Sequence, residues 1–583
     1  MNYSLIPTAQ TIVQHCQAND INNIVISPGS RNAPLTISFA ENPFFSCFSI
    51  VDERCAAFFA LGMAQQLQKP VVVICTSGSA LLNYYPAVAE AYYSNIPLIV
   101  ISADRPIYKV GIGDGQTINQ KNVFENQIGY SVNLRQDVSH ATDKILHYKK
   151  EWIKGGNVDK IQNEVQAYND AELNTAFKIA FTYQSPVHIN VPFEEPLYNT
   201  TTETIVIAQI EPIYTQEANQ TSLQREKEIW NSSKRKIVLV GVNKPHSVDE
   251  KVLQSLANDT SVLVLTETTS NLSHPNFFNS IDSIIAPIEM SNEKDTLFEN
   301  LQPEVLVTFG GLIVSKKIKA FLRTFSPKHH WHIGGVKAND TFFCLEKHIK
   351  VPVDTFFQEM YLDSKTIKSD YFSFWHQVKT EYVLKRSAYL AKIPFSDFSV
   401  FSQLMLSIPN NYLLQLANSS TIRYTQLFDM NPTLRVYCNR GTSGIDGSTS
   451  TAIGASVVSK TPTLFITGDL SFFYDSNALW NNSIKNNFRI IIINNKGGGI
   501  FRILPGKENT DVFKTYFETR HNLSAEHLCK MYGFEYRSAN SSEALEEVLS
   551  DFYSTSGCPR LLEINTPTLI NDKILIDYFR FIS

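Results

Sequence analysis

The chain has 583 residues, 43% of them hydrophobic, with a formal net charge of −5 and a pI near 6.3. At about 150 residues per domain this length predicts three or four domains, and the weak negative charge argues against nucleic acid as a partner. The eight cysteines form no CxxC pair and no metal-binding spacing with histidine, which predicts reduced core residues of a cytoplasmic protein. The start of the chain lacks the basic and apolar regions of a signal peptide, and the apolar runs are strand-sized, so no membrane insertion is expected.

Short apolar, β-branched runs alternate with helix-length amphipathic stretches along the chain, which predicts α/β layers built on parallel sheets. The expected strands are 23–27, 71–75, 98–102, 187–191, 237–241, 262–265, 305–309, 463–467 and 490–493. Their two-sided apolar character fits strands buried on both faces. Residues 147–173 are charged and rich in Asn and Gln, and we expect an exposed helical excursion there.

Polar stretches at 199–203 and 365–385 divide the chain into three predicted α/β domains: 1–198, 199–385 and 386–583. The first and last contain a weak internal repeat. Ala60-Leu61-Gly62 is followed by Pro70, a strand and the turn that begins at Thr76, while Ala452-Ile453-Gly454 is followed by Pro462, a strand and the turn that begins at Thr467. The step from Gly to Pro is eight residues in both copies. The outer domains are therefore predicted to be related doubly wound folds, with a different domain between them.

Two polar turns in the last domain predict a metal–phosphate site. Gly468-Asp469 ends one expected strand, and Asn494-Asn495 ends the next. The carboxyl ends of neighbouring parallel strands lie side by side, so a carboxylate and an amide oxygen can meet around one Mg²⁺ ion. The helix that opens after Asp469 favours a phosphate at its N-terminal amides. The alternative is two ordinary turns rich in Gly, Asp and Asn.

The paired turns resemble the thiamine-diphosphate (ThDP) signature, which begins Gly-Asp-Gly and closes at Asn-Asn; here Leu470 replaces the third residue. By that resemblance Mg²⁺, for which Mn²⁺ can substitute, is held by Asp469, Asn495 and Gly497, and the amides of Leu470 and Ser471 face the diphosphate. ThDP chemistry also needs an acid at the aminopyrimidine ring. Glu53 fits, because it precedes a helix of small residues in the first domain; alternatively, Asp52-Glu53 only supplies charge to that helix.

Several segments are similar to the 2-succinyl-5-enolpyruvyl-6-hydroxy-3-cyclohexene-1-carboxylate synthase family of menaquinone biosynthesis. They are Ser27-Pro28-Gly29-Ser30-Arg31-Asn32-Ala33-Pro34-Leu35, Ala103-Asp104-Arg105-Pro106, His188-Ile189-Asn190-Val191-Pro192-Phe193-Glu194-Glu195-Pro196-Leu197, Asn439-Arg440-Gly441-Thr442-Ser443-Gly444-Ile445-Asp446-Gly447 and Asn494-Asn495-Lys496-Gly497-Gly498-Gly499-Ile500-Phe501. The resemblance implies ThDP-dependent decarboxylation of 2-oxoglutarate and 1,4-addition of the resulting carbanion to isochorismate. It covers both outer domains and is thin in the middle.

Both substrates are dicarboxylates, and arginine binds carboxylates in a bidentate manner. The resemblance implies substrate contacts from Ser30, Arg31, Arg105, Gln116, Lys316, Ser419, Arg423, Arg440, Ile500 and Phe501, with Ile445 as the wedge that bends the cofactor. Arg423 and Arg440 are expected to act mainly on 2-oxoglutarate, and Arg31 and Arg105 mainly on isochorismate. In the central domain, Ser315-Lys316-Lys317 departs from the Lys-Arg that the family often shows. Lone arginines in loops are more often solvated or capping residues.

Three other functions stay open at this point. An acetolactate-synthase-like enzyme or 2-oxo-acid decarboxylase would share Glu53 and the metal site but need fewer arginines. A non-catalytic relative would have lost Glu53, Asp469 or Asn495, and the chain retains all three. A nicotinamide oxidoreductase is disfavoured because no Gly-x-Gly-x-x-Gly follows the first strand. The resemblance further implies a homodimer or a dimer of dimers, in which Glu53 of one chain and Asp469 of another share a cofactor.

Overall fold

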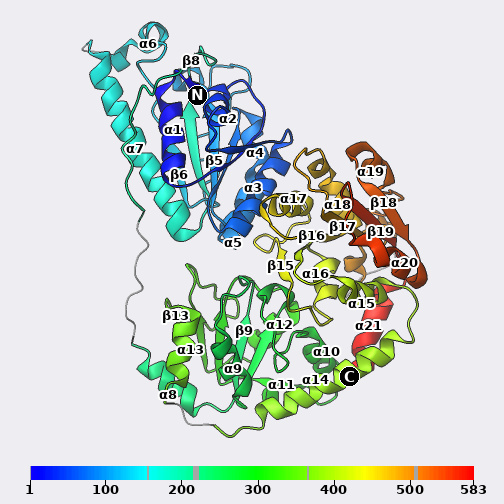
Figure 1. Ribbon diagram of the computed structural model, residues 1–583. Coiled ribbons are helices and arrows are strands. Elements are labelled where there is room, and N and C mark those ends of the chain that lie inside the picture. Colours follow the sequence, from blue (N-terminus) through cyan, green and yellow to red (C-terminus); the bar gives the residue numbers. More distant parts are fainter. Residues whose placement is uncertain (1, 154–155, 214–221, 364–366, 504–509) are drawn as a thin grey trace. The chain divides into compact units, whose positions relative to one another are not determined.

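The computed structural model describes residues 2–153, 156–213, 222–363, 367–503 and 510–583 (Figure 1). The chain divides into two compact units. The first comprises Met1–Thr215, Gly441–Lys460 and Tyr474–Lys485; the second comprises Gln216–Arg440, Thr461–Phe473 and Asn486–Ser583. Within the described residues, no helix combines the length and the apolar character needed to cross a bilayer. The two predicted boundaries between the three domains stay predictions.

The first unit is built on a six-stranded parallel sheet in the order β3-β2-β4-β5-β7-β6. Its strands are β2 (Asn23–Ile26), β3 (Ser46–Ser49), β4 (Val71–Cys75), β5 (Leu98–Asp104), β6 (Tyr130–Asn133) and β7 (Val187–Pro192), and β1 (Tyr3–Ser4) pairs separately with β8 (Thr200–Thr201). Its α-helices are α1 (Pro7–Ala18), α2 (Ala33–Ala40), α3 (Glu53–Leu67), α4 (Ser79–Asn83), α5 (Tyr85–Ser94), α6 (Thr142–Tyr148), α7 (Val158–Tyr183) and, from the later segments, α17 (Ser448–Val458).

The second unit contains two parallel sheets. The five-stranded sheet has the order β10-β9-β11-β12-β13, from β9 (Lys236–Val240), β10 (Val262–Thr266), β11 (Val305–Phe309), β12 (His329–Ile333) and β13 (Lys347–Ile349). The six-stranded sheet has the order β15-β14-β16-β17-β19-β18, from β14 (Leu413–Leu416), β15 (Arg435–Cys438), β16 (Thr463–Gly468), β17 (Phe488–Asn494), β18 (Glu535–Ala539) and β19 (Arg560–Asn565).

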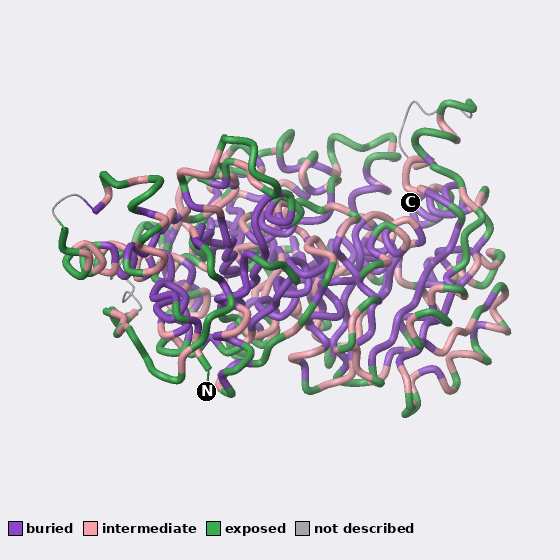
Figure 2. Tube along the Cα trace, turned by 90° about the horizontal axis from the view of Figure 1, so that it is seen from above, coloured by how far each residue is buried: buried purple, intermediate pink, exposed green. Residues whose placement is uncertain are grey.

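Helices of the second unit separate and cover these sheets. They are α8 (Gln224–Ser232), α9 (Glu250–Asn258), α10 (Asp282–Met290), α11 (Lys294–Leu301), α12 (Lys316–Thr324), α13 (Val353–Tyr361), α14 (Tyr371–Leu390), α15 (Asp397–Ser407), α16 (Ser420–Thr425), α18 (Asp469–Tyr474, whose last residue belongs to the first unit), α19 (Glu526–Tyr532), α20 (Ser542–Phe552) and α21 (Asn571–Ile582). Central strands such as β4, β9 and β11 are buried along their whole length, and Figure 2 shows exposed residues gathered in the loops and on the outer helix faces.

All nine expected strands form, each ending within two residues of its predicted bounds. The predicted kinship of the first and last α/β layers is also confirmed. Numbered by their own chain order, the strands of both six-stranded sheets run second, first, third, fourth, sixth, fifth. The five-stranded sheet between them runs second, first, third, fourth, fifth, which is the flavodoxin-like order of doubly wound folds.

The repeated glycines mark the place where α3 and α17 pack together within the first unit. A Cβ atom on Gly62 would lie 2.0 Å from the carbonyl oxygen of Thr451, and one on Gly454 would lie 2.0 Å from the carbonyl oxygen of Phe59. Only glycine permits such close backbone approach. The sequence repeat therefore records a symmetric helix–helix contact.

Candidate active site

Glu53 is the first residue of α3, directly after the loop that follows β3. The helix is capped by its neighbour: Asp52 accepts a hydrogen bond from the amide of Cys55 at 3.1 Å and one from Asn477 at 2.9 Å. Burial, and next the charge of Glu53, raise the pKa of Cys75, the last residue of β4. Asp52 thus caps α3, while Glu53 stands in its first turn, where an acid also suits the helix terminus; the charge of Glu53 is felt at the carboxyl end of β4.

Arg31 and Arg105 lie together at the carboxyl ends of β2, β5 and β7. Arg31 is 3% exposed; it donates to the carbonyl of Phe193 and to Glu195 Oε1, both at 3.1 Å. Arg105 donates to the carbonyl of Gly115 at 2.9 Å, and its Nη1 lies 3.9 Å from the same Glu195 oxygen. The Nε atoms of both arginines are buried and have no hydrogen-bond partner among the described residues.

The other first-unit candidates surround this arginine pair. Ser30 is exposed beside Arg31. Gln116, also exposed, follows the Gly115 carbonyl that holds Arg105. Its φ of 53° lies in the left-handed region, which is uncommon for a residue other than glycine and tends to mark functional positions. Ile445, the expected wedge, is 37% exposed and also belongs to the first unit.

A cavity of about 640 Å³ opens beside Arg105 within the first unit. Its wall includes Asp104. Burial raises the pKa of Asp104 to about 6, although a hydrogen bond from Asn190 acts to lower it. The wall also includes Trp152, Ile161, Val165 and Tyr168 from the charged excursion. That excursion contains the end of α6, a short 3₁₀ turn and the first part of α7, so it covers one side of this cavity.

The predicted metal–phosphate turns meet in the second unit. Gly468 pairs with Ile493 across β16 and β17, which places Asp469 beside Asn494-Asn495. Asp469 is 3% exposed; its Oδ2 accepts a hydrogen bond from the Gly497 amide at 2.9 Å, and its Oδ1 accepts one from the Leu470 amide at 2.7 Å. Ser471, in the same first turn of α18, is 4% exposed.

Asp397 is a second buried acid at this place, which the sequence did not point to. It accepts hydrogen bonds from Asn495 at 3.0 Å and from Thr566 at 2.6 Å. Burial raises its pKa to about 6, and the charge of Asp469 adds to the rise. The bond from Asn495 uses the nitrogen of that amide, which leaves its oxygen on the other branch of the side chain.

This donor set fits Mg²⁺. Within the described part of the chain, no group of three or more His, Cys, Asp or Glu side chains could hold a metal ion, so a cation here would take one carboxylate, an amide oxygen and a backbone carbonyl. Mg²⁺ is commonly held in this way, with phosphate and water completing its octahedron. A cation would also relieve the repulsion between two buried acids.

Arg423 and Arg440 form a second arginine pair, in the second unit. Burial and then the nearby charge of Arg440 lower the pKa of Arg423. Arg440 donates to the Oδ1 atom of Asn418 at 2.6 Å, and Asn418 in turn donates to the Asn439 carbonyl at 2.6 Å. Ser419 precedes α16 with φ 71° and ψ −126°, a strained conformation of the kind found at ligand-binding positions. Two like charges held close together favour an anionic ligand between them.

Two acids beside the central sheet, one after β10 and one at the start of α10, lie near this second pair. Glu267, 3% exposed at the end of β10, accepts hydrogen bonds from the amides of Val314 and Ser315, both at 2.7 Å. Burial raises its pKa to about 7, although those amides and the charge of Arg440 oppose the rise. Asp282 accepts a hydrogen bond from the Ser315 hydroxyl at 2.5 Å; burial raises its pKa, and Arg423 opposes that rise.

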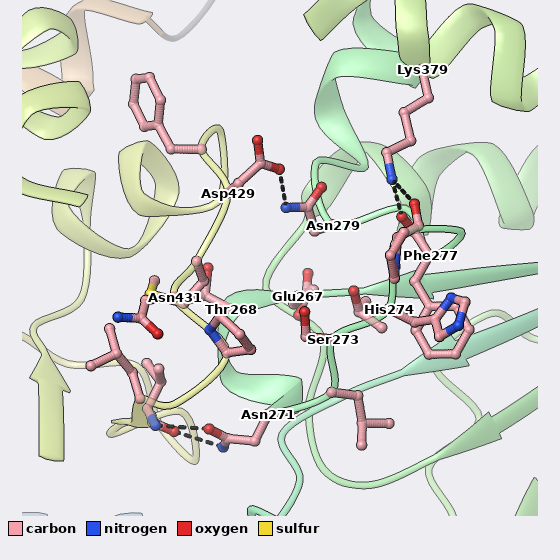
Figure 3. A pocket seen from close by; sticks show the side chains of 18 residues that line it. Glu267, Thr268, Asn271, Ser273, His274, Phe277, Asn279, Lys379, Asp429 and Asn431 are labelled. Atoms are coloured by element: carbon pink, nitrogen blue, oxygen red, sulfur yellow. Dashed lines mark hydrogen bonds between the residues drawn. The ribbon is translucent and has the colours of Figure 1, made fainter. Parts of the chain in front are cut away.

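These contacts fix the start of α12, where Lys316 is the first helical residue and is exposed. Lys317 instead pairs with Glu289. A cation at a helix N-terminus is electrostatically unfavourable, so Lys316 does not serve the stability of α12. Glu267 also lies in the wall of a cavity of about 440 Å³, which Figure 3 shows between the loop after β10 and residues 428–436.

Ile500 and Phe501 lie on a 3₁₀ turn, Gly499–Ile503, directly after the Asn-Asn turn. Both are partly exposed, and the ring of Phe501 lies 6.0 Å from that of Phe517. The candidates thus fall in both units. The first contains Glu53, the Arg31–Arg105 pair and Ile445, and the second contains the metal–phosphate turns, the Arg423–Arg440 pair, Lys316, Ile500 and Phe501. The sequence missed Glu195, Asn418, Glu267 and Asp397; of these, only Glu195 lay within a quoted segment.

The chain is similar to known proteins along its whole length. The family model "Thiamine pyrophosphate enzyme, N-terminal TPP binding domain" matches residues 6–129, and its C-terminal counterpart matches residues 418–564. A protein of Christiangramia forsetii named 2-succinyl-5-enolpyruvyl-6-hydroxy-3-cyclohexene-1-carboxylate synthase is 55% identical, with 100% of both chains covered. Proteins of the same name are 53% identical in Flavobacterium johnsoniae, with 100% of both chains covered, and 36% identical in Bacteroides fragilis, with 97% of each covered.

Proposed function

Because the chain belongs to the 2-succinyl-5-enolpyruvyl-6-hydroxy-3-cyclohexene-1-carboxylate synthase family, we propose that it performs the reaction of that family in menaquinone biosynthesis. It is a ThDP-dependent transferase that decarboxylates 2-oxoglutarate and joins the remaining four carbons to isochorismate by 1,4-addition, with release of CO₂. The observation that carries this proposal is the presence of two separate arginine pairs, Arg31 with Arg105 and Arg423 with Arg440. Two dicarboxylate substrates require this much positive charge.

Bound ThDP supplies the carbon nucleophile, and Mg²⁺ anchors its diphosphate. Asp469, Asn495 and the Gly497 carbonyl are the proposed metal ligands, and the first turn of α18 supplies the amides of Leu470 and Ser471 for the diphosphate. Glu53 holds a proton at the aminopyrimidine ring, since its neighbour Asp52 already caps α3. Ile445, Ile500 and Phe501 exclude water from the reacting atoms.

The substrates are divided between the two arginine pairs in this proposal. Arg31, Arg105, Ser30 and Gln116 hold isochorismate. Arg423, Arg440, Ser419 and Lys316 hold the carboxylates of 2-oxoglutarate. The like-charge repulsion that Arg423 and Arg440 already bear is relieved when a substrate carboxylate binds between them.

We further propose a homodimer, or a dimer of dimers, in which Glu53 of one chain and Asp469 of its partner serve one cofactor. A cytoplasmic location fits the eight cysteines, since none of them forms a disulfide and most are buried, as is usual in a reducing compartment. An acetolactate-synthase-like or decarboxylase activity remains the alternative.

The test is an assay of purified protein with ThDP and Mg²⁺. With 2-oxoglutarate and isochorismate present, the absorbance of isochorismate should fall and CO₂ should be released in equal amounts. With pyruvate in place of 2-oxoglutarate, no comparable turnover is expected. Turnover of pyruvate without consumption of isochorismate would establish the alternative.

A further inference from the structure

Glu195 links the two arginines of the first unit. Its Oε1 atom lies 3.1 Å from Arg31 Nη2 and 3.9 Å from Arg105 Nη1. The side chain of Arg31 is 4% exposed and that of Arg105 is 19% exposed, whereas that of Glu195 is 52% exposed. A half-exposed carboxylate therefore reaches inward to two largely buried guanidinium groups.

The physical reason for this arrangement is the charge of Arg31. A buried guanidinium without a counter-charge is costly, and Glu195 is the carboxylate that the structure records within 4 Å of it. The same site requires a carboxylate when substrate is bound, because the proposed function assigns both arginines to isochorismate. One position between the arginines is thus suited to two different carboxylates.

The side chain of Glu195 has a second cationic neighbour, Lys144. Its second oxygen, Oε2, lies 3.8 Å from Lys144 Nζ, and Lys144 is 41% exposed. Rotation towards Lys144 and water would release Arg31 and Arg105 without leaving the carboxylate unsolvated. The carboxylate of Glu195 is itself half in water, so its pairing contributes less free energy than that of a fully buried acid, and a substrate carboxylate held by both arginines can replace it.

The preceding residue, Glu194, is an acid whose side chain is held in place by several hydrogen bonds. Its side chain is fully buried and bonds Lys109 Nζ at 2.8 Å, the Tyr108 hydroxyl at 2.5 Å and the Glu195 amide at 2.9 Å. Despite burial, these hydrogen bonds and the charge of Lys109 lower its pKa. Lys144 is a fourth partner of Glu194, at 3.3 Å from its Oε1 atom. Adjacent acids thus have opposite properties: Glu194 is fixed by four partners, and Glu195 is half in solvent and borders the substrate arginines.

We propose that Glu195 is a placeholder for a substrate carboxylate: it neutralises Arg31 and Arg105 in the substrate-free enzyme and is displaced when isochorismate binds. Glu195 is therefore a positioning residue that lowers the apparent affinity for isochorismate while it keeps the arginine pair ordered. This inference rests on the proposed function, because it requires that Arg31 and Arg105 bind isochorismate.

The experiment is calorimetric titration of isochorismate into holoenzyme with ThDP and Mg²⁺ but without 2-oxoglutarate. In Glu195→Gln the competing charge is gone, and the dissociation constant should fall about two- to fivefold, the range of an ion pair whose acid is partly screened by water. The KM for 2-oxoglutarate should not change. An unchanged or increased dissociation constant for isochorismate would overturn the placeholder.

Three further variants separate the possible failures. In an Arg31→Ala background, Glu195→Gln should give no gain, because the two residues act on one another. Glu346→Gln, which removes an acid that pairs with Arg225 and His329 in the second unit, should leave isochorismate binding unaltered. If Arg31→Ala and Arg105→Ala weaken binding but Glu195→Gln does not strengthen it, only the placeholder fails; if the arginine variants have no effect, the substrate assignment fails with it.

Discussion

The two arginine pairs differ in the mobility of the acids that balance them. Arg31 and Arg105 share Glu195, which is half exposed and contacts Arg31 directly. Arg423 and Arg440 face Asp282 and Glu267, and Glu267 is fixed by two backbone amides. The first pair can exchange its counter-charge for a substrate carboxylate by a side-chain rotation. The acid beside the second pair is held in place, so the net charge there can change only when Glu267 gains or loses a proton.

The largest expected effects are losses of activity at Glu53, in the unit of the first arginine pair, and at Asp469, in the unit of the second. They test whether both units serve one reaction. Glu53→Gln should reduce turnover by about 10²–10⁴, the range for a positioned acid, whichever substrate is varied. Asp469→Ala should abolish metal-dependent ThDP binding, measured by calorimetry. Mixing the two inactive proteins under subunit exchange should restore at most about a quarter of wild-type activity, because half of the dimers are mixed and each has one intact site.

The shared-site proposal would be refuted by confirmed exchange of tagged subunits without any return of activity. Each chain would then build its own site from its own two units. Near-normal turnover of Glu53→Gln would instead show that Glu53 has no catalytic role. The mixing experiment would then lack its second inactive protein and could not test the assembly.

The second prediction concerns the division of substrates between the pairs. Arg440→Ala and Arg423→Ala should weaken the binding of 2-oxoglutarate, whereas Arg31→Ala and Arg105→Ala should weaken the binding of isochorismate. Each loss should be about 2–5 kcal/mol, because a buried partner of a carboxylate is removed. The measurement is the KM for each substrate in each variant. Equal effects on both substrates would show that the two regions form a single anion site, and the comparison drawn above would not hold.

These regions also show what the sequence could and could not reveal. The strands, and the meeting of Asp469 with the Asn494-Asn495 turn, were predictable because apolar runs and the turns that end them are local patterns, and neighbouring parallel strands fix the rest. The role of Glu195 was not predictable, because its partner Arg31 lies 164 residues away in the sequence and only packing of the loops brings the two together. Asn418 and Glu267 are similar: an ordinary amide and an ordinary acid gain their roles from the arginine that tertiary structure places beside them.

The smallest expected effect is a pH dependence that belongs to the second pair alone. Burial raises the pKa of Glu267 to about 7, against the pull of the Val314 and Ser315 amides and of Arg440, and the charge of Asp282 adds to the rise. Below pH 7 the acid is neutral and Arg440 acts on substrate undiminished; above pH 7 the carboxylate offsets that charge. The KM for 2-oxoglutarate should therefore rise about two- to fivefold as pH increases through 7, which corresponds to roughly 0.4–1 kcal/mol.

Glu267→Gln is the variant that checks this step, since glutamine keeps an acceptor oxygen for one of the two amides but cannot ionise. Its KM for 2-oxoglutarate should lack the step near pH 7, while isochorismate binding follows the same pH curve in both proteins. Stability gives an independent readout. A folded-state pKa above the usual value of about 4.3 means that ionised Glu267 opposes folding, so wild type should lose stability relative to Glu267→Gln between about pH 4.3 and 7 and show a constant difference above that. Parallel melting curves across that range, together with an unchanged KM step in the variant, would show that the charge of the second pair is set elsewhere.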